Sequence, residues 1–176
     1  MNGMMTKTES AISEGRTLFP MKRKSAAVLG KTENVLKIPG KGNKLGRRIT
    51  KGKWKGYKIF LLTLEERATC PPSCFHWGTC YGNNMPFATR YHVDEHLERR
   101  MWSELTTLQR KNPLGFAIRL HILGDFFSVA YVEFWRKALN AFPALRIWGY
   151  TGRIDKDDPV HVALSSLRRD ESRFRI

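Results

Sequence analysis

Along the last two thirds of the chain, short continuous apolar runs alternate with segments in which apolar residues recur at helical spacing. Short, nearly continuous apolar runs at residues 57–64, 116–123 and 145–150 predict buried strands, because glycine, proline or charged residues bound each run. Residues 173–176 predict the start of a fourth strand. These runs are the expected sheet of the protein.

Between the apolar runs, hydrophobic residues recur at helical spacing. A long helix is predicted over residues 87–110, and Pro113 ends it because proline disfavours a helical residue before it. Ser128 is a suitable cap for a second helix, and Asp158 followed by Pro159 predicts the start of a third. The order β-α-β-α-β-α-β predicts an α/β fold, either a partial (β/α) barrel or an open parallel sheet.

The N-terminal quarter of the chain has a different composition. Residues 1–44 are rich in Lys, Ser, Thr and Gly and lack sustained periodicity, so we expect a flexible, disordered basic arm. Residues 1–58 carry 15 Lys and Arg against three Glu, whereas residues 59–176 carry 16 against 13 acidic residues. The positive charge therefore lies mainly before the α/β domain, which we place at residues 45–176.

The number of cysteines and the hydropathy of the chain indicate in which compartment the protein works. Residues 1–14 are polar, which argues against a signal peptide, and no apolar segment approaches the roughly 18 residues that span a bilayer. The odd number of cysteines argues against a secreted disulfide framework. We therefore expect a soluble, cytoplasmic protein that does not associate with membranes.

The three cysteines, Cys70, Cys74 and Cys80, fall within eleven residues directly after the first predicted strand. Three thiolates on one loop suit a [4Fe–4S] cluster with one iron left open, because cysteine is the usual cluster ligand. Zinc is the alternative, since His76 would complete a four-ligand Cys3His site. A third alternative is three reduced thiols that only pack the loop.

Polar residues also follow the second and third predicted strands. Gly124 and Asp125 end one run, and Thr151 follows the other. Because the carboxyl ends of parallel strands meet at one edge of a sheet, we expect these residues to converge with the cysteine loop. His121 lies four residues before Asp125, and strand alternation directs both side chains to the same face; we expect a packed histidine.

A strand, a three-cysteine loop ending in Cys80-Tyr81, a helix, and a strand ending in Gly124-Asp125 together resemble the first half of a radical S-adenosylmethionine (SAM) enzyme barrel. The resemblance implies that the cysteines bind a [4Fe–4S] cluster, and that Gly124-Asp125 contacts the methionine amine of SAM. The second cysteine gap here is five residues rather than the usual two, and Asp125 replaces the commoner glutamate. These two differences from the usual pattern affect the expected SAM contacts more than the expected metal ligands.

A closer resemblance extends from about residue 43 to the C-terminus. Residues 62–71 (LTLEERATCP), 80–85 (CYGNNM), 119–126 (RLHILGDF) and 149–151 (GYT) resemble the phage "gene product 88" family. The family occurs in phages and prophage-bearing bacteria, and the resemblance implies relatives rather than a particular reaction. Its members continue into the strand that residues 173–176 begin, so we expect a chain that is incomplete at its C-terminus.

Two functional hypotheses follow. The first is radical SAM-like chemistry on an unknown substrate, with the cluster on the three cysteines and SAM held by Gly124, Asp125 and Thr151. The second is a non-enzymatic accessory protein, stapled by zinc, that binds nucleic acid through its basic arm. The nucleic-acid contacts expected in that case are Lys44, Arg47, Arg48, Lys51 and Lys53.

Overall fold

A computed structural model describes residues 6–40 and 44–176. Its main sheet contains β2 (Lys58–Leu61), β4 (Phe116–Leu120), β5 (Leu145–Gly149) and β6 (Phe174–Arg175), and all neighbouring strands are parallel. Their spatial order, β2-β4-β5-β6, follows their order along the chain. Over the described residues the sheet is open, so the α/β class and the parallel sheet are confirmed and no closed barrel forms there.

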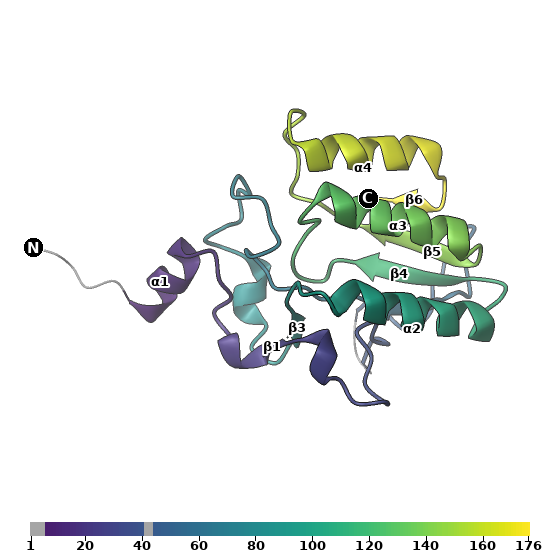
Figure 1. The fold of residues 1–176 in the computed structure, drawn as a ribbon, viewed down its shortest axis with the longest axis horizontal. Helices are drawn as coiled ribbons and strands as arrows, with labels where there is room; N and C mark the ends of the chain where they lie inside the picture. Colours follow the sequence, from purple (N-terminus) through teal and green to yellow (C-terminus); the bar gives the residue numbers. More distant parts are fainter. Residues whose placement is uncertain (1–5, 41–43) are drawn as a thin grey trace, which may run out of the picture.

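Three helices connect these strands: α2 (Leu97–Lys111), α3 (Val129–Ala141) and α4 (Pro159–Asp170). Figure 1 shows them side by side in one layer along the sheet. The predicted caps of two helices are confirmed. The Ser128 hydroxyl accepts a hydrogen bond from the backbone of Tyr131, and the Asp158 carboxylate accepts one from the backbone of Val160.

The core lies between this helical layer and one face of the sheet. Alternate strand residues point to the helices, and the inward side chains of α2 and α3 complete the packing. The fully buried residues of this interface include Phe116, Ile118, Ile147, Leu105, Met101, Tyr131 and Trp135. Among the described residues, no helix is long and apolar enough to cross a membrane.

The start of α2 differs from the sequence prediction. Residues 87–96 are not helical; they include β3 (Arg90–Tyr91), which pairs in parallel with β1 (Arg23–Lys24). Both residues of β3 are buried, so tertiary contacts outweigh the helical spacing of Tyr91. Asp94 then accepts hydrogen bonds from the backbone N–H groups of His96 and Leu97, which fixes where the helix begins.

Residues 6–40 also differ from the expected disordered arm. They form α1 (Lys7–Ser13), the short 3-10 helices η1 (Pro20–Lys22) and η2 (Ala26–Val28), and β1. Val35 and Leu36 enter the core, and the buried Glu104 of α2 accepts hydrogen bonds from both of their backbone N–H groups, at 2.9 and 2.8 Å. Isolated apolar residues with buried polar partners therefore order a segment that shows no periodicity.

Lys37 and the basic stretch after residue 43 cover the outer edge of β2. Lys37 and Arg48 form antiparallel bridges to Leu61 and Lys58, and further backbone hydrogen bonds join residues 47–49 to residues 56–59. An edge strand paired in this way no longer offers its backbone to another chain.

Candidate metal and cofactor site

Three loops meet at the carboxyl end of the sheet, where the sequence predicted a site. The Asp125 carboxylate, after β4, accepts hydrogen bonds from the Thr151 hydroxyl and the Gly152 N–H, both at 2.7 Å. Both donors follow β5. Asp125 therefore joins the loop after β4 directly to the loop after β5. The residue is buried, at 4% exposed.

The cysteine loop reaches the same place. Thr69 accepts a hydrogen bond from the backbone N–H of Asp125 at 3.1 Å and donates one to the carbonyl of Glu65. The Cys74 Sγ atom lies 3.6 Å from the point where a Cβ would stand on Gly152, and Asp125 Oδ2 lies 3.5 Å from that point. The Cys74 thiol, the Asp125 carboxylate and the backbone of Gly152 are thus neighbours at this edge.

Two glycines allow the loops to come this close. Gly124 has φ +81°, and a Cβ there would stand 2.5 Å from the Thr69 hydroxyl. At Gly149, the last residue of β5, a Cβ would stand 1.6 Å from the Leu120 carbonyl oxygen. Gly124, predicted as a cofactor contact, therefore shapes the turn that presents Asp125.

Burial changes the ionisation of the site. It raises the pKa of Asp125, and the hydrogen bonds from Thr151, Gly152 and Phe126 oppose that rise. Burial is also the main reason that the pKa of Cys70 rises to about 12, with smaller contributions from Asp125, Cys74 and Cys80. A nearby cation would favour the thiolate, because its positive charge attracts the negative charge that burial makes costly.

The three thiols are free and half-buried, and they belong to one loop. Within the described residues, no group of three or more His, Cys, Asp or Glu side chains is arranged as a set of metal ligands. The chemistry of the donors still fits a soft metal, since cysteine sulfur is a soft ligand and all three cysteines are free. His76 is exposed, and its ring packs on Phe75 at 4.1 Å between centroids.

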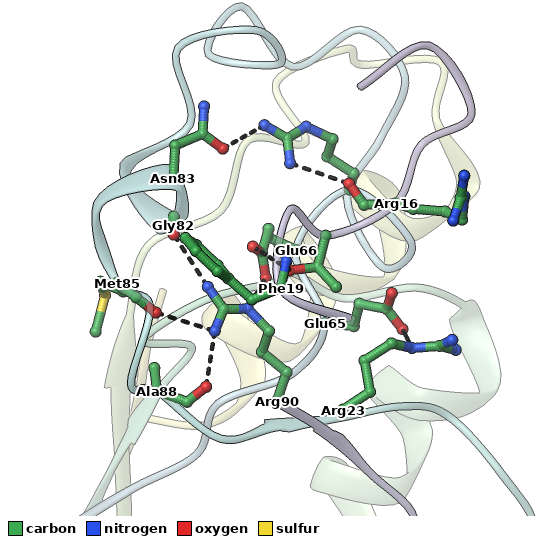
Figure 2. Close-up of polar contacts among 12 residues, drawn as sticks. Arg16, Phe19, Arg23, Glu65, Glu66, Gly82, Asn83, Met85, Ala88 and Arg90 are labelled. Atoms are coloured by element: carbon green, nitrogen blue, oxygen red, sulfur yellow. Dashed lines mark hydrogen bonds and ion pairs between the residues drawn. The ribbon is translucent and has the colours of Figure 1, made fainter. Parts of the chain in front are cut away.

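A buried ion pair lies beneath the cysteine loop (Figure 2). Arg90 Nε contacts Glu66 Oε2 at 2.7 Å, and both side chains are almost completely excluded from solvent. Arg90 also donates to the carbonyls of Gly82, Met85 and Ala88, which lie in the chain segment just after the loop. This guanidinium therefore fixes the path of the chain that leaves Cys80.

Arg67 holds the loop from the other side. Its guanidinium donates to the carbonyl of Trp77 at 2.9 Å, to the carbonyl of Arg16 and to the Asn83 side chain. Arg67 has φ +61°, an uncommon conformation for a residue with a side chain. Its three partners, from three separate segments, offset that backbone cost and connect the loop to the N-terminal residues.

Sequence reasoning missed this supporting network. The signal available was a run of three charged residues, Glu65, Glu66 and Arg67, placed directly between a buried strand and the cysteines. All three are buried, and Glu65 pairs with Arg23 of β1 at 2.7 Å. Charged residues in such a position need partners, but the partners of these three lie 10 to 51 residues away in the sequence.

The arginine of β4, Arg119, and the histidine just after this strand, His121, lie apart from the cysteines' contacts. His121 is buried, its Nε2 lies 3.1 Å from the Tyr131 hydroxyl, and burial lowers its pKa to about 3. This agrees with the predicted packed histidine. Arg119 stands over the ring of Tyr150 at 4.8 Å, and Arg153 pairs with Asp158 at 2.7 Å.

The residues predicted to contact nucleic acid lie away from the thiols, along the edge of β2 and in the turn before it. Arg47 and Arg48 are in the antiparallel segment, with side chains that bond to the carbonyls of Pro39 and Gly56. Lys44, Lys51 and Lys53 are exposed. Residues 44–53, which the sequence places where the expected arm meets the α/β domain, are therefore part of the folded structure.

Comparison with known proteins supports one assignment. The family model of gene product 88 matches residues 35–165, which include the cysteine loop, Asp125 and Thr151. No curated protein and no solved structure matches the chain. Since the family model covers most of the sequence, the chain belongs to the gene product 88 family.

Proposed function

We propose that Cys70, Cys74 and Cys80 hold a [4Fe–4S] cluster, and that the adjoining edge of the sheet binds SAM for radical chemistry on a substrate not yet identified. The observation that carries the proposal is the meeting of Cys74, Gly152 and Asp125 at the carboxyl end of three consecutive strands. Such edges are where α/β folds place their ligands. When bound, the cluster and SAM would supply the radical.

The chain's own residues would bind and orient. A carboxylate offers about four acceptor positions. Thr151, Gly152 and Phe126 occupy three positions of Asp125, which leaves one for an ammonium group of the ligand. The burial of Asp125 would exclude water and strengthen that contact.

The first test is anaerobic purification, followed by a visible spectrum and quantification of iron, sulfide and zinc. We expect a brown protein with iron and sulfide in equal amounts. Cys74→Ala should lose the iron, whereas Ser73→Ala, an exposed neighbour in the same loop, should keep it. A full cluster in Cys74→Ala would contradict the ligand assignment.

Zinc is the rival metal in this site, and His76 separates the two. His76→Ala should leave an iron–sulfur cluster in place, because the proposed ligands are the three thiols. Release of one zinc from a colourless protein by the same variant would favour a structural Cys3His site instead. Such a site would make the protein a zinc-stapled accessory protein rather than a radical enzyme.

SAM binding has its own variant. Asp125→Asn should keep the iron content but weaken SAM binding, because the amide cannot match the charge of the carboxylate. Thr151→Ser is the matched control, since it retains the hydroxyl that supports Asp125. Equal SAM affinity in Asp125→Asn and the parent protein would remove Asp125 from the proposed site.

A further inference from the structure

The sheet face turned away from the helices carries a row of arginine and tryptophan. Residues of this face alternate with the buried ones that face the helices. Arg119 of β4 is in register with Trp148 of β5, and Trp148 is in register with Arg175 of β6. One aromatic ring therefore stands between two guanidinium groups across three strands.

More aromatic side chains extend this row. Tyr150 lies two residues after Trp148, so it continues on the same face, and it is 78% exposed. Arg119 stands 4.8 Å from the Tyr150 ring. Trp54, from the turn before β2, lies 5.3 Å from the Arg175 guanidinium. Aromatic rings and cations thus lie next to one another along this row.

The three aromatic side chains and Arg175 border a groove of about 520 Å³. Its walls include three aromatic and three basic side chains: Trp54, Trp148, Tyr150, Arg48, Lys51 and Arg175. Among the described residues, none that lines the groove is acidic. The sequence reinforces this, because residues 34–64 contain no Asp or Glu. The groove is therefore suited to a polyanion that also has flat, apolar groups.

We propose that this groove binds single-stranded nucleic acid, with unpaired bases on Trp148, Tyr150 and Trp54 and the backbone phosphates on the surrounding cations. Aromatic rings beside a basic groove are how sequence-tolerant single-strand binders work. Tyr150 is exposed, and Trp54 and Trp148 are half-buried. The bases of a duplex are already stacked and cannot use these rings. The inference goes beyond the proposed function and holds whether or not the cysteines bind a metal.

The binding experiment uses the full chain and a fluorescein-labelled oligothymidylate of about 20 nucleotides, followed by fluorescence anisotropy. We expect binding that weakens linearly on a logarithmic salt scale. A duplex of the same length should bind more weakly at each salt concentration. Absence of binding at about 50 mM salt, or equal affinity for the duplex, would overturn the proposal.

The aromatic contribution is tested at Trp148. Trp148→Ala should weaken oligothymidylate binding about tenfold, because each stacked base contributes roughly this much or more. Trp148→Phe keeps an aromatic face and should retain most of the affinity, which separates stacking from loss of folding. Phe87→Ala is the control, since Phe87 is 88% exposed and does not line the groove. An unchanged affinity in Trp148→Ala would overturn the assignment.

The charge contribution is tested with two double variants of equal charge. Lys51→Gln with Arg175→Gln removes two groove cations and should lower the salt slope by about 1.4, since each single-strand phosphate contact contributes about 0.7. Lys137→Gln with Arg169→Gln removes two cations on the helical layer and should leave the slope unchanged. Equal slopes in the two variants, or a dimer in sedimentation that closes the groove, would contradict the proposal.

Discussion

The helical layer on the sheet and the region around the cysteine loop are both closely packed, but different interactions hold them. In the first, the contacts are between apolar side chains such as Leu105, Ile118 and Trp135, all fully buried. In the second, the buried groups include Glu65 and Glu66, which make ion pairs, and Arg67 and Arg90, which donate hydrogen bonds to backbone carbonyls.

The comparison shows how differently the two regions respond to change. An apolar contact is not directional, so a truncated side chain costs stability across the whole packed layer. A buried ion pair is directional, and removal of one partner leaves the other charge without compensation. We therefore expect a substitution in the loop region to cause a large loss of stability confined to that region. A substitution in the helical layer should destabilise the whole layer.

The largest effect is expected for Glu66→Gln. It leaves the Arg90 guanidinium buried without its charged partner, at a cost of about 3–5 kcal/mol. Hydrogen exchange should show lost protection around residues 66–90, with α3 and β5 still protected. Uniform loss of protection over the whole chain would mean that the two regions unfold together.

Leu105→Ala is expected to cost about 3 kcal/mol, because it removes a fully buried side chain from the helical layer. Here urea unfolding followed by far-ultraviolet circular dichroism and by tryptophan fluorescence should shift to the same extent. If only one of the two signals moved, the helical layer would not be the single unit that its packing indicates.

His121 brings a polar group into the apolar region, and its effect depends on pH. Burial lowers its pKa to about 3 from an ordinary value of 6.5, so only the unfolded chain takes up the proton between these values. The stabilising contribution is therefore complete above pH 6.5 and is lost as the pH falls. Between pH 6.5 and 5 the loss is about 2 kcal/mol.

His121→Phe should remove that part of the pH dependence, whatever it does to stability at neutral pH. The measurement is the free energy of unfolding in urea at pH 7.5 and pH 5. A variant with the same pH dependence as the parent would show that other groups cause the acid sensitivity.

The smallest effect is expected for Glu133→Gln. Glu133 contacts Arg136 at 3.2 Å on the exposed side of α3, and exposed pairs contribute about 0.5 kcal/mol or less. It is the matched control for Glu66→Gln, since the same substitution acts on an ion pair in water. A cost comparable to that of Glu66→Gln would show that burial does not distinguish the two pairs.

The sequence predicted the helical layer well because its signals are local. Strand runs, the cap at Ser128 and the Asp158-Pro159 start each depend on residues that are close along the chain. The convergence of Asp125 and Thr151 followed from parallel strand order. The path of residues 6–40 and of residues 87–96 could not be predicted in this way, because it depends on distant partners such as Glu104 and Glu66.

Side-chain contacts that join the N-terminal residues to the cysteine loop also have a kinetic consequence. Arg67 reaches Arg16, Thr17 reaches Glu66, and Trp77 reaches Ile12. Contacts between residues this far apart form slowly, because a long loop must close before they contribute. We expect the helical layer to fold first and the thiols to reach their final positions last, so that metal uptake would follow the closure of the N-terminal segment.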